Sequence, residues 1–214
     1  MIAAIFDLDN TIIPGVSVER RFFYRLLRER RIGFREIART AGFLIRNLHR
    51  LSSTTLYSNK PYLAGKSVNE LEQMGIQYAT EEVLSRVSQE ALAHLSRHRA
   101  AGHLLVIITG CPDFLFAPLS PHLKADIVIS GRLEHRAGQF TGRAESPYPY
   151  GKGKRLLLQE LVKSHGIDLA QSFAYADRPS DAAILSAVRH PAAVNPGRRL
   201  ARIAKRRGWK VLHW

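Results

Sequence analysis

The sequence has little cysteine and no long apolar run, and each absence removes a class of protein. Cys111 is the only cysteine among the 214 residues, so no disulfide can form within the chain, as is usual in a reducing cytoplasm. No stretch approaches the roughly 18 apolar residues that a membrane-spanning helix needs. Asp7 interrupts the apolar run at the N-terminus, which therefore lacks the pattern of a secretory signal peptide. We expect a cytoplasmic protein with no membrane span.

Acidic residues are also scarce relative to basic ones. Asp and Glu together number 18 against 32 Lys and Arg, which gives a net charge of +14. Such a chain attracts anions, namely nucleic acid, acidic lipid surfaces or phosphorylated small molecules. The excess is spread along the chain and is densest over residues 19–50 and 198–210, which we interpret mainly as solvated surface.

Apolar runs and helical periods alternate along the chain. A buried strand is expected over residues 1–6, and a purely helical pattern follows from residue 16 to residue 99. The helices expected in that stretch cover 18–31, 34–51, 67–79 and 80–102, the last two with Ser67 and Thr80 as N-terminal caps. The remaining expected elements are strands over 103–110, 125–131, 172–177 and 191–195, a hairpin over 132–144, and helices over 112–123, 151–166, 180–190 and 196–208.

The order of these elements predicts an α/β fold. Alternating strands and helices form a parallel sheet with helices on both faces. The helical stretch after the first strand is too long to be a loop inside a compact domain. We therefore expect a core domain made of residues 1–15 and 100–214, and an all-helical subdomain made of residues 16–99.

Acidic residues follow two of the predicted strands. The run "IFDLDNT" takes the first strand into Asp7 and Asp9, and Asp177 follows the fourth strand with Asp181 four residues later. The carboxyl ends of parallel strands meet at one edge of the sheet, where ligands bind. Also expected at that edge are Thr109, Gly110 and either Lys154 or Lys152. Carboxylates this close repel each other unless a cation lies among them, and an all-oxygen ligand set favours Mg²⁺.

Four segments together resemble the motifs of the haloacid dehalogenase superfamily. "FDLDNT" is similar to motif I, "VIITG" to motif II, "YGKGK" with Lys154 to motif III, and "YADRPSD" to motif IV. They occur in the right order, and the resemblance covers essentially the whole chain. The helical stretch resembles a type 1 cap, and the chain looks most similar to subfamily IB, the phosphoserine phosphatase-like group. The resemblance implies a Rossmann-like α/β core with this cap inserted after the first strand.

The resemblance also implies roles for single residues. Asp7 would be the nucleophile that forms an aspartyl-phosphate, and Asp9 would protonate the leaving group and then activate water. Asp9 must therefore be neutral part of the time, and the charge of Asp7 would raise its pKa. The implied Mg²⁺ ligands are Asp7, the backbone carbonyl of Asp9, and Asp177. The implied phosphate-binding groups are Thr109, the Gly110 amide and Lys154, while Asp181 would hold metal-bound water or Lys154, and Thr11 would steady the motif I loop.

One residue departs from the family pattern. Arg178 stands where the family usually has Gly or Ser, so it either assists phosphate binding or crowds the site. In the helical subdomain, Glu19 is a candidate for binding an amine. Four arginines there are interpreted mainly as solvated surface and alternatively as ligands for an acidic group of the substrate; they are Arg20, Arg21, Arg46 and Arg50.

These residues predict a Mg²⁺-dependent phosphatase that acts on a small phosphomonoester, such as phosphoserine or histidinol phosphate. Two alternatives remain open. A phosphotransferase would use the same residues, and a basic module binding nucleic acid or an anionic membrane would use the fold as a scaffold. The expected partner is a small phosphorylated metabolite and not nucleic acid, and the sequence indicates no oligomeric state.

Overall fold

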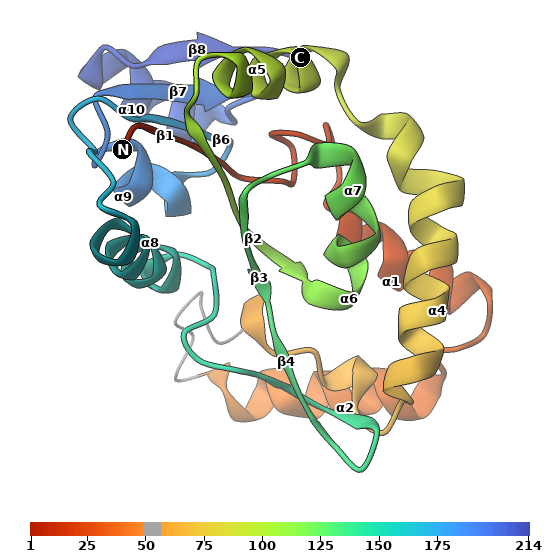
Figure 1. Ribbon diagram of the computed structural model, residues 1–214. Helices are drawn as coiled ribbons and strands as arrows, with labels where there is room; N and C mark the ends of the chain where they lie inside the picture. The colour runs from red at the N-terminus through yellow and green to blue at the C-terminus, as the bar shows by residue number, and fades with distance from the viewer. Residues whose placement is uncertain (49–56) are drawn as a thin grey trace.

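The computed structural model describes residues 1–48 and 57–214 (Figure 1). The end of the helix expected over 34–51, including Arg50, lies outside the described residues. A six-stranded sheet forms the centre, in the order β3-β2-β1-β6-β7-β8, with every neighbouring pair parallel. The strands in that order are Ile127–Gly131, Leu104–Pro112, Ala3–Phe6, Phe173–Ala176, His190–Val194 and Lys210–Leu212. The predicted α/β fold with a parallel sheet is confirmed.

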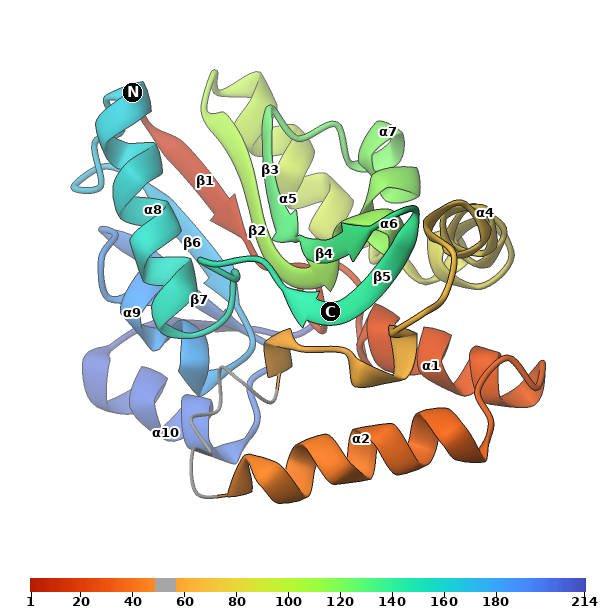
Figure 2. The same ribbon diagram turned by 90° about the horizontal axis from the view of Figure 1, so that it is seen from below.

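Helices cover both faces of the sheet, because its strands are apolar on both sides. In β1, Ala4 and Phe6 belong to one buried cluster, whereas Ala3 and Ile5 belong to the other. The second cluster is closed by α8, α9 and α10, which span Lys152–His165, Ala182–Leu185 and Arg198–Arg207. The opposite face is covered by α5, α6 and α7, which span Gln89–Ala100, Asp113–Phe116 and Ser120–Leu123 (Figure 2).

Between β1 and α5 the described residues are largely helical, as expected. This segment contains α1, α2, the short turn η2 and α4, which span Val18–Arg28, Phe34–Arg46, Pro61–Leu63 and Val68–Tyr78. Ser67 caps α4 as predicted, because its hydroxyl accepts a hydrogen bond from the Glu70 amide at 3.4 Å. The division into a core and a helical subdomain at the predicted boundaries stays a prediction.

The prediction of a single helix over residues 80–102 is wrong. The chain instead makes a π-helical turn over Ala79–Val83 and a 3-10 turn over Leu84–Arg86 before α5 begins at Gln89. Ser88 is the N-cap of α5 and also donates its own amide to the Ile12 carbonyl at 3.0 Å, so contact with the motif I loop breaks the helix here. Thr80 donates its hydroxyl to the Ile76 carbonyl and caps nothing.

The hairpin and the last strand have different outcomes. The hairpin is confirmed, with β4 over Leu133–Arg136 and β5 over Gln139–Ala144. The strand β8 was not predicted, because three residues carry too little pattern to separate a strand from a tail. None of the helices in the described residues is long and apolar enough to cross a membrane.

Candidate active site

Three buried carboxylates meet at the carboxyl edge of the central strands. All four residues of β1 are buried, and the strand ends where the Asp7 amide donates to the Tyr175 carbonyl of β6 at 2.9 Å. The loop after β6 carries Asp177 and Asp181, both of which are buried like Asp7. One oxygen of each of the three carboxylates lies within 4.8 Å of the other two. The structure therefore brings together three of the acidic residues that the sequence had placed at this edge.

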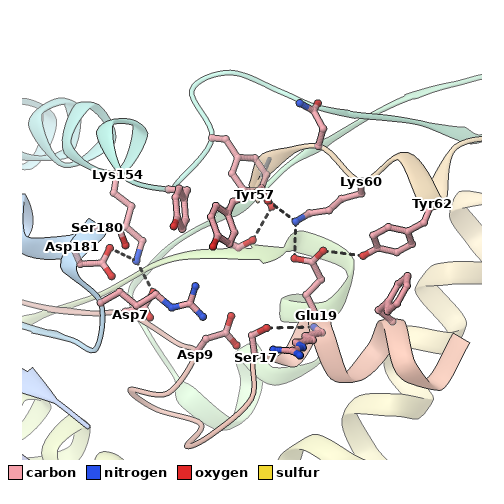
Figure 3. A pocket seen from close by; sticks show the side chains of 17 residues that line it. Asp7, Asp9, Ser17, Glu19, Tyr57, Lys60, Tyr62, Lys154, Ser180 and Asp181 are labelled. Atoms are coloured by element: carbon pink, nitrogen blue, oxygen red, sulfur yellow. Dashed lines mark hydrogen bonds and ion pairs between the residues drawn. The ribbon is translucent and has the colours of Figure 1, made fainter. Parts of the chain in front are cut away.

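Lys154 supplies positive charge inside this cluster. Its Nζ lies 2.5 Å from Asp7 Oδ1 and 3.0 Å from Asp181 Oδ1 (Figure 3). Burial would lower the pKa of Lys154, but the carboxylates of Asp181 and Asp7 outweigh burial and hold it above its usual value. The alternative candidate, Lys152, is exposed, so the ammonium at this site comes from Lys154.

A glycine lets α8 begin this close to the site. A Cβ on Gly153 would lie 1.8 Å from the backbone oxygen of Tyr148, so only glycine fits between this loop and the first turn of α8. Tyr148 in turn donates its hydroxyl to the Gly110 carbonyl at 2.7 Å, which links this loop to the end of β2. Sequence reasoning missed both residues, although the small residue between two lysines in "GKGK" was a visible signal.

The charge and the free oxygen of this cluster fit a hard cation. Three carboxylates face one buried ammonium, and burial together with the charge of Asp7 raises the pKa of Asp177. Asp177 Oδ2 accepts a hydrogen bond from Asn10 Nδ2 at 3.1 Å, whereas the buried Oδ1 has no hydrogen-bond partner in the structure. An unpaired buried carboxylate oxygen in an all-oxygen set is what Mg²⁺ coordination would satisfy.

Asp9 points from the same loop toward the start of α1. Its Oδ1 accepts a hydrogen bond from the Val18 amide at 2.8 Å. Burial, and next the charge of Asp7, raise the pKa of Asp9 to about 6. The sequence had indicated repulsion from Asp7 as a cause, and the structure adds burial as the larger one. A carboxyl with such a pKa exchanges protons near neutral pH, as an acid–base group must.

The other predicted site residues divide into two sets. Gly110 and Arg178 line the same cavity as Asp7, Asp9, Lys154 and Asp181. Thr109 and Thr11 are fully buried beside it and do not line it. The Thr109 hydroxyl accepts a hydrogen bond from the Cys111 amide at 3.0 Å, and burial raises the pKa of the Cys111 thiol, which keeps it uncharged. Arg178 is 41% exposed, with its Nε 3.7 Å from Asp177 Oδ2.

The cavity continues from the acidic cluster toward the helical segment and measures about 410 Å³. Glu19 lines it, but both carboxylate oxygens are already paired, one with Lys60 Nζ at 2.6 Å and the other with the Tyr62 hydroxyl at 2.8 Å (Figure 3). Three further tyrosines line the same space, Tyr57, Tyr148 and Tyr150. Sequence reasoning missed Lys60 and the tyrosines, because nothing in the linear pattern places them opposite Glu19.

The arginines expected in the helical segment do not all reach this cavity. Arg20 lines it. Arg21 donates to the Pro14 carbonyl at 3.1 Å, and Arg46 is exposed on α2 away from the cavity lining. Arg50 lies outside the described residues. Arg20 is therefore the cavity arginine of this set within the part of the chain that the structure describes.

A network of hydrogen bonds connects the motif I loop to Asn195 and Trp214. Asn10 adopts a left-handed backbone conformation (φ 56°) and donates its side chain to both Asp177 Oδ2 and the Asn195 carbonyl. Asn195 donates its side chain to the Asn10 carbonyl at 3.0 Å and to the Trp214 carbonyl at 2.8 Å. The Trp214 indole donates to the Thr11 carbonyl. These residues were not identified from the sequence, and they fix the loop that carries Asp7 and Asp9.

Comparison with known proteins identifies the family of this chain and several of its relatives. A family model described as haloacid dehalogenase-like hydrolase matches residues 4–186. The chain is 31% identical to the "Inhibition of morphological differentiation protein" of Streptomyces azureus, over 98% of this chain and 77% of that protein. It is 28% identical to the phosphoserine phosphatase SerB1 of Mycobacterium tuberculosis (98% and 70% covered) and 25% identical to the histidinol-phosphatase of Neisseria meningitidis (99% and 98%). A crystal structure of a Bordetella pertussis protein of unknown function superimposes with a TM-score of 0.83 at 28% identity, covering 98% and 97% of the two chains.

Proposed function

Because the chain belongs to the haloacid dehalogenase-like hydrolase family, we propose that it is a Mg²⁺-dependent phosphatase that hydrolyses a small phosphomonoester through an aspartyl-phosphate on Asp7. The observation that carries the proposal is the buried cluster of Asp7, Asp177 and Asp181 around Lys154, with Asp177 Oδ1 left unpaired. The family membership and the intact cluster support an enzyme over a binding module that merely uses the fold.

The residues present divide the chemistry between them. Asp7 and Asp177, with the Asp9 carbonyl, would hold Mg²⁺, which when bound neutralises phosphate charge and orients the phosphoryl group. The Asp7 carboxylate attacks phosphorus, and the bond from phosphorus to the leaving oxygen breaks. Asp9 gives its proton to that oxygen and later takes a proton from the water that attacks phosphorus, which releases phosphate and restores Asp7. Lys154 holds Asp7 in place and offers its charge to the phosphoryl oxygens.

The cavity and the relatives support a class of substrate. A volume of about 410 Å³ suits a metabolite-sized ester. Relatives named phosphoserine phosphatase and histidinol-phosphatase support an amino-alcohol phosphate. Lys60 already neutralises the charge of Glu19, so we propose that Lys60 leaves Glu19 when such a substrate enters and that the amine takes its place.

Phosphate release across a panel of phosphorylated metabolites tests the proposal. The panel includes phosphoserine, histidinol phosphate and a generic aryl phosphate, each with Mg²⁺ and with chelator, for the wild type and Asp7→Asn. Asp113→Asn is the matched control, because Asp113 is a partly buried carboxylate on α6 that does not line the cavity. We expect Mg²⁺-dependent turnover that Asp7→Asn abolishes and the control keeps. Turnover that survives in Asp7→Asn, or none from any substrate, would refute the proposal.

The same assay addresses the phosphotransferase alternative, because both reactions share the intermediate on Asp7. Adding an alcohol acceptor divides the phosphoryl group between water and the alcohol. We expect inorganic phosphate to account for the substrate consumed. A phosphorylated alcohol as the main product would show that the protein is a phosphotransferase and not a hydrolase.

A further inference from the structure

The helix α2 turns its apolar side away from the protein. None of its residues is buried. Phe34 is 87% exposed, Ile45 is 67% exposed, and Leu48, just beyond the helix, is 59% exposed. The exposed apolar side chains recur every three or four residues and so form one continuous stripe along the helix. The members of this apolar stripe are Phe34, Ile37, Ala38, Ala41, Leu44, Ile45 and Leu48.

The opposite side of α2 is what holds it to the molecule. The Arg39 guanidinium donates to the Ala64 carbonyl just after η2, and Phe43 on the same side is partly covered. Figure 2 shows α2 along the outer edge of the molecule with the turn η2 beside it. A surface helix normally buries its apolar stripe and exposes its polar side. Here the orientation is reversed, so the stripe is available to something outside the chain.

Basic residues lie along one edge of this stripe. The helical spacing places Arg35 and Arg46 between the apolar stripe and the inner side that carries Arg39 and Phe43, whereas the helix has a single acidic residue, Glu36. Both Arg35 and Arg46 are exposed, and neither makes an ion pair within the described residues. The whole chain carries a charge of +14, so the protein as a whole also attracts anionic surfaces. The stripe and its arginines are therefore complementary to an apolar layer bordered by negative charge.

Two kinds of partner can offer an apolar surface to the stripe, and their charges distinguish them. A second copy of this chain, packed stripe to stripe, would bring its own row of arginines to the same helix, and like charges at an interface are unfavourable. An anionic bilayer offers acyl chains for the stripe and phosphates for the arginines, which is the arrangement of an interfacial amphipathic helix. Charge complementarity therefore favours the bilayer.

We propose that α2 docks this protein on the surface of anionic lipid membranes. The apolar stripe would enter the boundary between headgroups and acyl chains, while Arg35 and Arg46 would contact lipid phosphates. Since the inner side of α2 rests near η2, and Tyr62 of η2 lines the cavity, docking would place this wall of the cavity one helix away from the membrane. The proposal concerns the surface alone and does not depend on which phosphate ester is hydrolysed.

Sedimentation with vesicles tests the apolar part of this proposal. The full-length protein is mixed with vesicles containing phosphatidylglycerol or with vesicles of phosphatidylcholine alone, and bound protein is measured. We expect the double variant Leu44→Glu/Ile45→Glu to lower the affinity for anionic vesicles at least about tenfold, because two apolar side chains lose their burial. Leu156→Glu on α8 is the matched control, since Leu156 is also exposed but lies outside the stripe. All variants should keep their turnover of a soluble aryl phosphate.

The dependence of binding on charge and the oligomeric state of the protein complete the test. Arg35→Gln/Arg46→Gln and added salt should each weaken binding to anionic vesicles, because the phosphate contacts are electrostatic. Equal binding to neutral and anionic vesicles would overturn the assigned lipid class. A wild-type dimer in light scattering that becomes monomeric in Leu44→Glu/Ile45→Glu, with no vesicle binding, would assign the stripe to a second copy. A monomer that binds no vesicles would overturn the proposal entirely.

Discussion

Replacing Asp177 with Asn should make the metal-free protein more stable while removing its response to Mg²⁺. Asp177 is the carboxylate of the cluster that makes no ion pair with Lys154, whereas Asp7 and Asp181 both do. The variant keeps the shape of the side chain and can still accept the hydrogen bond from Asn10. It removes the charge of the side chain and changes little else, so its effect on stability measures the electrostatic repulsion within the site.

The distances give the size of this effect. Lys154, Asp7 and Asp181 together carry a net charge of −1, and the ligand oxygens of the three carboxylates lie within 4.8 Å of one another. At an effective dielectric constant of about 20, the repulsion felt by Asp177 is about 3 kcal/mol. The half-exposed Arg178, with Nε 3.7 Å away, offsets about 1 kcal/mol of it. The free energy of unfolding should therefore rise by about 2 kcal/mol, and Tm by about 4–8 °C for a chain of this size.

Thermal unfolding in chelator and in Mg²⁺ measures both parts of the prediction. The wild type should gain stability with Mg²⁺, because a ligand that binds only the folded state shifts the equilibrium toward it. Asp177→Asn should have the higher Tm in chelator and gain little from Mg²⁺. Asp113→Asn, which alters a carboxylate outside the cavity, should behave like the wild type. A lower Tm for Asp177→Asn in chelator, or an undiminished gain with Mg²⁺, would refute the reasoning.

Three further changes test other parts of the structure. Lys154→Met should lower the free energy of unfolding in urea by about 3–5 kcal/mol, since it leaves Asp7 and Asp181 buried without their cation; unchanged stability would contradict the pairing. Asp9→Asn should slow phosphate release by about 10²–10⁴-fold and leave the Mg²⁺ shift in Tm intact, and wild-type release would exclude the acid–base role. Burial, and then the proximity of His103, lower the pKa of His98 to about 4. The unfolded state then binds the proton first, so stability should fall as the pH drops from about 6.5 to about 4, by about 2 kcal/mol near pH 5. Urea unfolding against pH should show this loss for the wild type, and a His98→Gln variant with the same slope would argue against it.

The sheet and the acidic cluster could be predicted because they depend on few assumptions. Apolar runs such as "IAAIF" and "LLVII" are long enough to mark buried strands, and alternation with helices fixes their direction. Residues that follow parallel strands then converge at one edge, whatever the detailed packing. Asp7, Asp177 and Asp181 needed no knowledge of side-chain contacts to be placed together. The strand β8 escaped prediction because three residues carry no periodicity.

Contacts between distant segments could not be predicted in this way. The periodicity of residues 80–102 suits one helix, but the bond from the Ser88 amide to the Ile12 carbonyl interrupts it. The periodicity of α2 correctly predicts a helix without saying that its apolar side faces outward. Both outcomes are set by tertiary contacts, which override local propensity.

The contacts among the residues that line the cavity near the helical segment could not be predicted from the sequence either. Glu19 was visible as a candidate, but its pairing with Lys60 joins residues 41 positions apart and depends on how α1 and η2 pack. The residues to which we assign phosphoryl transfer lie at strand ends, which the fold aligns in a fixed manner. We expect the choice of substrate to depend on Glu19, Lys60 and Tyr62, whose positions depend on that packing. We therefore expect that a chain of this architecture can change its substrate through the helical segment while the carboxylates of the core keep the same reaction.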